Sequence, residues 1–454
     1  MNFTKTINWT AKFYKLLERF NQEDRFPIDT IIDNSFPEFL SRLQTFSKVA
    51  KIGVCSTNGK RTVVDLLNQM FLINKNTFIT NVNKNAKKYP ILTSIILNLA
   101  ESEGFIEQEK DYYTMAMDEY ELAGYFNSIK FDYLLLGNLF NDQKDFCTLE
   151  EKRRKIQDAV ILNSDCNLII NADEPMFYHI DEIEKELITP KKMNKFFFGF
   201  NRIEIIDNDE CIQKNDILRC PVCGCKLDYK KRFYSHIGQY DCECGFKRPE
   251  LDISADAKVY SDYTFLNVYY KGNKFVFKVP LGGVYNAYNA LEAISTALFL
   301  GIERRIITSA LENYQNLRAR DEIINFKGKE IKIKEIKNPV SLTEAIRELS
   351  GSRNQKVVFA LNDEEIDGED TSWIWDSNFN ALKNFENRIY VCSNRIDDMA
   401  LRIKYGGVNP ALISMDISIK NAVKCCFYEL ERNEKMLILA TPSTISDIYR
   451  ILEK

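Results

Sequence analysis

Short apolar runs alternate along most of the chain with stretches in which apolar residues recur at helical spacing. The first run, SKVAKIG (47–53), ends just before the loop STNGKRT, and VVDLLNQMFL (63–72) then shows helical spacing. Strands alternating with helices predict a mostly parallel sheet that is covered on both faces. Further strand-like runs are YYTMAM (112–117), DYLLLGN (132–138) and CNLIIN (166–171), separated by helical segments such as LEEKRRKIQDAVILNS (149–164).

The alternation is interrupted once and then begins again. Residues 211–252 are rich in Cys, Gly, Pro and aromatic residues, so we interpret them as an insertion. We place a domain boundary near residue 315, which gives a first α/β domain (1–314) containing the insertion and a C-terminal Rossmann-like α/β domain (315–454). The runs that follow the insertion are TFLNVYY, KFVFKVP and the helical YNALEAISTALFLG, and those of the second domain are EIKIKEI, SLTEAIREL, KVVFALND, RIYVCSN and KMLILA.

Composition and charge narrow the class of protein. With 45% hydrophobic and 28% charged residues the chain is a folded protein, and a net charge of −4 without a long basic run favours small-molecule or protein partners over nucleic acid or membrane. The N-terminus lacks the apolar core of a signal peptide, and no segment approaches ~18 uninterrupted apolar residues. We therefore expect a cytoplasmic protein without a transmembrane segment, with thiols or metal ligands rather than disulfides among its 12 cysteines.

The segment STNGKRT (56–62) is a candidate phosphate-binding loop, because it lies between a predicted strand and a predicted helix. Small residues in such loops let backbone N–H groups face the phosphates, and a lysine, here Lys60, reaches the outer phosphates. The next position normally provides the hydroxyl that holds Mg²⁺, but it is Arg61, which cannot ligate a cation. An ordinary glycine-containing turn is the alternative interpretation.

A cysteine cluster in the insertion predicts a metal site. Two cysteine pairs, each followed by glycine, build two tight turns that let four thiolates surround Zn²⁺ as in zinc ribbons. The first pair has C-x-x-C spacing and the second C-x-C; free thiols are the alternative, and Cys225 is a spare thiol that could substitute. We expect a structural metal, because no acidic or basic dyad is near, and we expect His236 to be a surface or packing residue. The four candidate ligands are Cys220, Cys223, Cys242 and Cys244.

The acidic segment ALNDEEIDGEDTSWIWD (360–376) follows a predicted strand, at the carboxyl end where open α/β sheets place ligand or catalytic groups. Acidic loops are often only solvated. Two of the chain's three tryptophans, Trp373 and Trp375, favour an interface or binding site here. Histidine is scarce, since His179 and His236 are the only two in the chain, so a mechanism that needs a histidine base must use one of them or one from a partner.

These pieces, in this order, resemble the Mur ligase family and, within it, the MurT-type ligase subunits. The cysteine insertion and the ALND…DG.D.SWIWD segment distinguish the MurT type from other Mur ligases. The resemblance covers about residue 35 to the C-terminus and implies a P-loop central domain with a zinc-ribbon insertion and a second α/β domain. Its other segments are STNGKRT, NLFNDQKD, NADEP, CGFKRPEL, GGVYNAYNALEA, RARDE, KNPVSLTEAI and NRIDDMALRIKYGGV.

The function implied by the resemblance belongs to peptidoglycan biosynthesis in the bacterial cell wall. It is the ATP-dependent amidation of the D-glutamate α-carboxyl in lipid II, giving D-isoglutamine through an acyl phosphate. A GatD-type glutaminase partner would supply ammonia in a heterodimer, and an aspartate of this chain, Asp370 first and Asp367 second, would complete its triad. Residues implied to contact ATP and Mg²⁺ are Thr57, Asn58, Gly59, Lys60, Thr62, Asn286, Asn289 and Arg320.

The chain departs from the family pattern mainly where Mg²⁺ would bind. MurT-type loops usually read GTNGKTT, so Ser56 replaces a glycine and Arg61 replaces the Mg²⁺-binding threonine. Family members carry a glutamate where this chain has Ala116, and Ser341 stands where a glycine is common.

Three nearby residues are candidates to replace the lost metal ligands: Thr62, Asp118 and Glu119. The alternative function is a diverged MurT-like paralogue that keeps the fold and the partner surface but has lost phosphoryl transfer. Addition of an amino acid, as in ordinary Mur ligases, is less expected, because few residues precede the phosphate loop.

Overall fold

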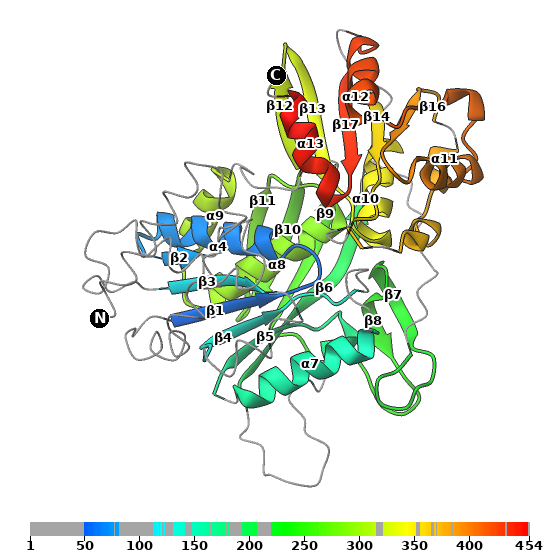
Figure 1. Ribbon diagram of the computed structural model, residues 1–454. Coiled ribbons are helices and arrows are strands. Elements are labelled where there is room, and N and C mark those ends of the chain that lie inside the picture. The colour runs from blue at the N-terminus through cyan, green and yellow to red at the C-terminus, as the bar shows by residue number, and fades with distance from the viewer. Residues whose placement is uncertain are drawn as a thin grey trace, which may run out of the picture.

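The computed structural model contains two α/β sheets and a separate two-stranded hairpin (Figure 1). It describes residues 50–76, 78–80, 112–117, 119, 122, 130–140, 148–163, 165–177, 180, 193–206, 219–260, 262–314, 321–350, 355–364, 367–368, 370–383, 385–431 and 434–452.

The first sheet has nine strands among the described residues, in the order β11-β10-β9-β6-β5-β4-β1-β3-β2. Strands from β2 to β9 pair in parallel, whereas β9, β10 and β11 form an antiparallel meander at one edge. The carboxyl ends of parallel strands meet at one edge of a sheet, so the loops after β1, β3, β4 and β5 lie together. The strands are β1 (Ala50–Cys55), β2 (Phe78–Thr80), β3 (Tyr112–Met117), β4 (Tyr133–Leu136), β5 (Asn167–Asn171), β6 (Lys195–Ile205), β9 (Ile253–Val259), β10 (Thr264–Tyr270) and β11 (Asn273–Val279).

Helices cover this sheet on both sides. Figure 1 shows α4 (Lys60–Ile73), α8 (Val284–Phe299) and α9 (Arg304–Glu312) together on one side and α7 (Leu149–Leu162) on the other. Apolar residues of α4 and α8 form a continuous core with the strands. Helix α7 begins with a capping box, in which Thr148 and Glu151 bond to each other's backbone N–H groups.

The second sheet has the order β12-β13-β17-β14-β15-β16, parallel except for the β12–β13 pair. Successive side chains of a strand point to opposite faces, so Val357 and Phe359 pack with α10 and α11, whereas Val358 and Ala360 pack with α12 and α13. Its elements are β12 (Asp321–Phe326), β13 (Lys329–Glu335), α10 (Pro339–Ser350), β14 (Gln355–Ala360), β15 (Ile389–Cys392), α11 (Ile396–Tyr405), β16 (Ile413–Met415), α12 (Ile419–Tyr428), β17 (Lys435–Ala440) and α13 (Pro442–Leu452), with short 3₁₀ turns η1 (Pro175–Phe177), η2 (Ser372–Trp375), η3 (Asn380–Leu382) and η4 (Pro410–Leu412).

The cysteine insertion forms a small unit around the hairpin β7 (Asp228–Tyr234) and β8 (Ile237–Asp241). We call residues 219–250 the ribbon. Its own apolar cluster contains Leu227, Tyr240 and Phe246 together with Cys220 and Cys242. In Figure 1 the hairpin lies beside the carboxyl-end loops of the first sheet, next to the second sheet.

The predicted α/β fold is confirmed, and the elements predicted from apolar runs occur within a few residues of their expected bounds. Seven of the described strands were not predicted, namely β2, β6, β7, β8, β9, β12 and β16. Several have weak or short apolar patterns: β2 and β16 have three residues each, and β12 (DEIINF) begins with charged residues. In the part of the chain that the structure describes, no helix is both long and apolar enough to cross a bilayer.

Candidate active site and metal centre

The candidate phosphate loop, residues 56–59, connects the end of β1 to the start of α4. Gly59 has φ 85°, a left-handed conformation that favours glycine. A Cβ at this position would lie 1.9 Å from Oδ1 of Asn289, so the absence of a side chain lets α8 approach the loop. Lys60 is buried at the first position of α4, where unpaired backbone N–H groups and the helix dipole favour an anion.

The loop after β4 holds the phosphate loop by hydrogen bonds. The backbone N–H of Thr57 donates to the Asn138 carbonyl (3.0 Å), and the N–H of Asn58 donates to Oδ1 of Asn138 (2.9 Å). The Asn138 amide returns a bond to the Asn58 carbonyl (2.8 Å), and the N–H of Phe140 donates to Oγ1 of Thr57 (3.0 Å). These hydrogen bonds hold the phosphate loop against residues 138–140.

The altered metal positions lie close to this loop. Arg61 is exposed, and Thr62 is half-buried in the first turn of α4. Ala116 lies in β3 beside Val54 of β1 and brings no ligand atom. Glu119 is buried, and its carboxylate accepts a hydrogen bond from Oγ1 of Thr57. Glu119 is thus the described carboxylate that contacts the phosphate loop; Asp118 lies outside the described residues.

A second glutamate, which the sequence analysis did not single out, lies behind the loop. Glu292 of α8 is buried, and burial raises its pKa to about 8. A Cβ on Gly137 would lie 2.3 Å from Oε2 of Glu292 and 2.4 Å from Oγ of Ser56. Oε1 of Glu292 and Oγ of Ser56 are both buried without a hydrogen-bond partner. Ser56, at the position where the family pattern has a glycine, therefore lies near a buried carboxyl group.

The second sheet reaches the phosphate loop through the segment after β13. Nζ of Lys337 donates to the Thr57 carbonyl (3.3 Å), and the Asn338 amide donates to Oδ1 of Asn58 (3.4 Å). Oγ of Ser341 accepts from the Lys337 backbone N–H (3.0 Å), which fixes this turn. Lys337 was not predicted as a site residue, although its position shortly after a predicted strand was a signal. Arg320 lies outside the described residues.

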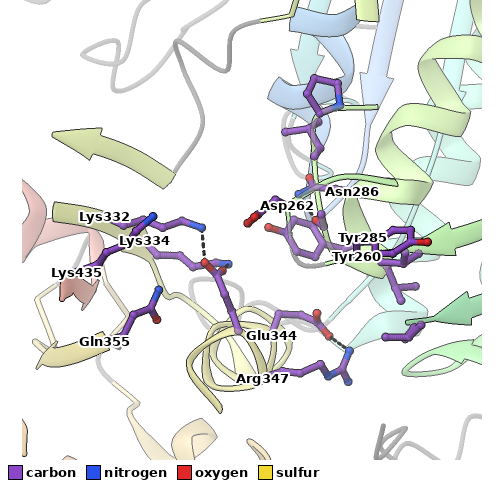
Figure 2. A pocket seen from close by; sticks show the side chains of 18 of the residues that line it. Tyr260, Asp262, Tyr285, Asn286, Lys332, Lys334, Glu344, Arg347, Gln355 and Lys435 are labelled. Atoms are coloured by element: carbon purple, nitrogen blue, oxygen red, sulfur yellow. Dashed lines mark hydrogen bonds and ion pairs between the residues drawn. The ribbon is translucent and has the colours of Figure 1, made fainter. Parts of the chain in front are cut away.

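A cavity of ≈570 Å³ lies between the two sheets. Residues 280–286 line one side, and β13 and α10 line the other (Figure 2). All four of its lining cations are paired: Lys334 lies 2.7 Å from Glu348, Arg347 lies 2.9 Å from Glu344, Lys435 lies 2.9 Å from Glu330, and Lys332 also contacts Glu348. Burial opposes ionisation of Glu348, but the neighbouring lysines lower its pKa to about 2. Asn286 lines the cavity, and its side chain accepts a hydrogen bond from Asn289 (3.3 Å).

The four predicted cysteine ligands come together in the ribbon. Their sulfur atoms all lie within 4.8 Å of one another, with 3.7 Å between Cys220 and Cys244 and 3.5 Å between Cys223 and Cys242. Zn–S bonds of about 2.3 Å in a tetrahedron separate the sulfurs by about 3.8 Å. The thiols fit zinc, and the short C-x-C pair contributes both of its sulfurs. Cys225 is exposed and is not one of the four.

His236 is not a ligand of this cluster, but it is not a surface residue either. It is buried, and its Nε2 lies 2.9 Å from Oε2 of Glu174. Asp173 makes a second buried pair with Arg248 of the ribbon (2.6 Å), and burial raises the pKa of Asp173 to about 6 despite that partner. The expectation that the insertion lies away from any acid–base pair was wrong, because the fold brings the segment NADEP to it.

The two aspartates of the acidic segment differ in their surroundings. Asp367 is buried and accepts hydrogen bonds from the backbone N–H (2.8 Å) and Oγ (2.5 Å) of Ser443. Asp370 is exposed, and bonds from the N–H (2.8 Å) and hydroxyl (3.0 Å) of Ser372 lower its pKa. The Asp367 carboxylate is used up in contacts within its own domain, whereas the Asp370 carboxylate is accessible to another molecule.

The two tryptophans of this segment also differ in burial. Trp373 is buried in the core of the second sheet, whereas Trp375 is exposed and lies 5.7 Å, ring to ring, from the exposed Tyr405. Arg402 lies over the Trp375 ring and donates to the Ile374 carbonyl (2.9 Å). Trp375, Tyr405 and the exposed Leu401 form an apolar surface on η2 and α11, which we call the aromatic surface.

Comparison with known proteins shows which family the chain is similar to. The family model described as MurT ligase C-terminal matches residues 336–445, which span α10 to α13. The MurT subunit of lipid II isoglutaminyl synthase (glutamine-hydrolyzing) from Staphylococcus aureus strain COL is 28% identical over 371 residues, which are 80% of this chain and 79% of that protein. These similarities support assignment of the chain as a MurT-type member of the Mur ligase family.

Other relatives agree. The MurT subunit of Streptococcus pneumoniae strain ATCC BAA-255 / R6 is also 28% identical, over 76% of this chain and 74% of that protein. Among solved structures, a pseudomurein peptide ligase type C from Methanothermus fervidus has a TM-score of 0.65 at 18% identity, covering 89% of this chain and 79% of that one. A MurF ligase from Thermotoga maritima in complex with ADP has a TM-score of 0.60 at 15% identity, covering 92% and 83%. The Mur ligase fold is therefore confirmed.

Proposed function

We propose that this chain is the ATP-dependent subunit of a glutamine-dependent amidoligase that converts the D-glutamate α-carboxyl of lipid II to D-isoglutamine. One observation supports this most directly: Lys337 of the MurT-type second half contacts the phosphate loop of the first half. The two halves thus share one site, as a ligase that joins nucleotide and acceptor requires. The proposal includes a cytoplasmic location and a division into domains near residue 315, between the two sheets.

The chemistry assigned to this site is carboxylate activation. A carboxylate oxygen of the substrate attacks the γ-phosphorus of ATP, ADP leaves, and ammonia then displaces phosphate from the acyl carbon. Lys60 at the start of α4 and Lys337 opposite it would neutralise charge that develops on the transferred group. The structure of a MurF relative bound to ADP supports a nucleotide here. Asn289 lies against Gly59 of the phosphate loop, and Asn286, one turn earlier on α8, lines the cavity. This cavity could therefore hold the nucleoside.

Mg²⁺ would neutralise the phosphates when bound. Glu119 is placed for it, because it is buried beside Thr57 and close to the loop. Carboxylates and hydroxyls are the oxygen ligands that Mg²⁺ accepts. We propose that Glu119 replaces the carboxylate lost at Ala116, with Thr57 orienting it.

The glutaminase partner would dock on the second sheet near Asp370. The relatives are named as subunits of a glutamine-hydrolyzing synthase. Asp370 is exposed and held by Ser372, so its carboxylate can complete a triad whose Cys and His come from the partner. The aromatic surface is suited to the same partner, because exposed tryptophan and tyrosine are typical of binding hot spots. Asp367, bonded to Ser443, is the less suitable candidate.

The ribbon would hold one zinc ion with a structural role. Four cysteine sulfurs close the tetrahedron and leave no open position for substrate.

The test is a reconstituted reaction with the purified chain, a GatD-type glutaminase subunit, lipid II, glutamine, ATP and Mg²⁺. We expect amidated lipid II and ADP in equal amounts, and we expect Lys60→Ala to abolish both. Asp370→Asn should stop product formation from glutamine while leaving activity with added ammonia. A complex that assembles but turns over no ATP at saturating Mg²⁺ would contradict the proposal.

A diverged subunit without phosphoryl transfer is the second candidate. Arg61 and Ala116 remove two metal ligands of the family pattern, and this observation favours it. It predicts partner binding without ATP turnover. ATP hydrolysis that depends on Lys60 would exclude it.

A further inference from the structure

The ribbon hairpin inserts a histidine into the interior of the first sheet's loops. His236 lies in the turn between β7 and β8, and its Nε2 is 2.9 Å from Oε2 and 3.1 Å from Oε1 of Glu174. The histidine ring packs against Phe140, with centroids 5.0 Å apart. Glu174 follows β5 and is fully buried. The ribbon is therefore bonded to the carboxyl-end loops, although it is an insertion in sequence.

Glu174 also bonds to the segment that holds the phosphate loop. Its carboxylate accepts the backbone N–H of Leu139 (3.2 Å), in the middle of segment 138–140. That segment bonds to Thr57 and Asn58 on its other side. The ribbon is thus connected to the phosphate loop through one glutamate, Glu174, and one short backbone segment, residues 138–140.

A second connection runs through helix α8. Arg248 at the end of the ribbon pairs with Asp173, and Oδ2 of Asp173 accepts the hydroxyl of Tyr288 (2.9 Å). Tyr288 directly precedes Asn289, whose amide lies against Gly59 of the phosphate loop. Both adjacent acids of NADEP therefore connect the ribbon to the loop, by two independent paths.

We propose that the ribbon is a positioning element of the nucleotide site, with His236 and Arg248 as positioning residues. Without these side chains the two buried carboxylates lose their histidine and arginine partners and keep only backbone and hydroxyl donors, so the segments they hold are expected to shift. The phosphate loop would then lose its fixed geometry without losing any residue that contacts the nucleotide. The inference rests on the proposed function, in that the phosphate loop binds ATP.

The experiment measures ATP affinity of the full chain by calorimetry, with zinc content and partner binding recorded for each variant. We expect His236→Ala to bind ATP about tenfold more weakly, with zinc and partner binding unchanged. His236→Gln keeps a donor for Glu174 and should stay near the wild-type affinity. Lys230→Ala is the matched control, because Lys230 lies on the same hairpin, is exposed and contacts only Asp241 at 3.9 Å among the described ion pairs.

Three outcomes would contradict either the positioning role of the ribbon or the proposed function. Wild-type affinity in His236→Ala would overturn the positioning role. An equal loss in His236→Ala and His236→Gln would show only damaged packing, and would overturn it as well. A wild-type chain that binds no ATP would instead defeat the proposed function.

Discussion

The ribbon and the phosphate loop are connected through Glu174 and residues 138–140, but they are built in opposite ways. The ribbon collects its four thiols from two pairs within 25 positions, and its apolar cluster comes from the same segment. The phosphate loop depends on the loops after β3 and β4, on α8, and on Lys337 from the second sheet. A locally built site tolerates changes elsewhere, whereas a site assembled from distant segments can lose one ligand and recruit another.

The largest effect is expected in the ribbon. Cys220→Ser should release the metal and lower the free energy of unfolding by about 3 kcal/mol or more, because metal binding holds the two turns together. Cys225→Ser is the control, since Cys225 is exposed and outside the cluster. Metal analysis should find about one zinc per chain in the wild type and in Cys225→Ser, and none in Cys220→Ser. Zinc-free wild-type protein that is fully folded would refute the ribbon site.

A second prediction concerns the contact that the second sheet's domain makes with the phosphate loop through Lys337. Lys337→Ala should lower kcat/KM for ATP by about 100-fold, because it removes a buried cation that faces developing phosphate charge. Lys435→Ala, a cavity-lining lysine that is half-exposed, should change it little. Steady-state kinetics at fixed Mg²⁺ measures both. Equal values for the two variants would mean that the second sheet does not take part.

A third prediction uses pH to test the buried carboxyl behind the phosphate loop. The pKa of Glu292 is raised to about 8 in the fold, so between its unfolded value and pH 8 the folded state binds the extra proton. Stability from this group is therefore present at low pH and is lost as pH rises through 8. Glu292→Gln should match the wild type near pH 5 and exceed it by about 2 kcal/mol near pH 9. Urea unfolding at both pH values measures this; parallel curves would contradict it.

The smallest expected effect is a gain at the altered metal position. Arg61→Thr restores a hydroxyl after Lys60 and should lower the Mg²⁺ concentration for half-maximal ATP turnover by about threefold. Arg61→Lys is the control, because it keeps a cation and adds no ligand. If Arg61→Thr changes nothing, Glu119 with Thr57 already supplies the site that Mg²⁺ needs.

The sequence by itself determined the alternation of strands and helices, the insertion and its four cysteines. These features are local: period-two and period-3.6 patterns reflect burial of one side chain at a time, and cysteine spacing within a short segment limits how far the sulfurs can be apart. The strands YYTMAM and TFLNVYY were therefore predicted correctly, and Cys242 and Cys244 lie close to Cys220 and Cys223 as expected.

Tertiary structure alone decided which distant residues meet. His236 was expected at the surface or in packing, yet it pairs with Glu174, 62 positions away, and Lys337 reaches Thr57 across 280 positions. Asp367 and Asp370 are three residues apart, but Asp367 is buried and bonded to Ser443, whereas Asp370 is exposed. Burial and long-range pairing arise from the order of strands in the sheets, which the pattern along one chain does not specify.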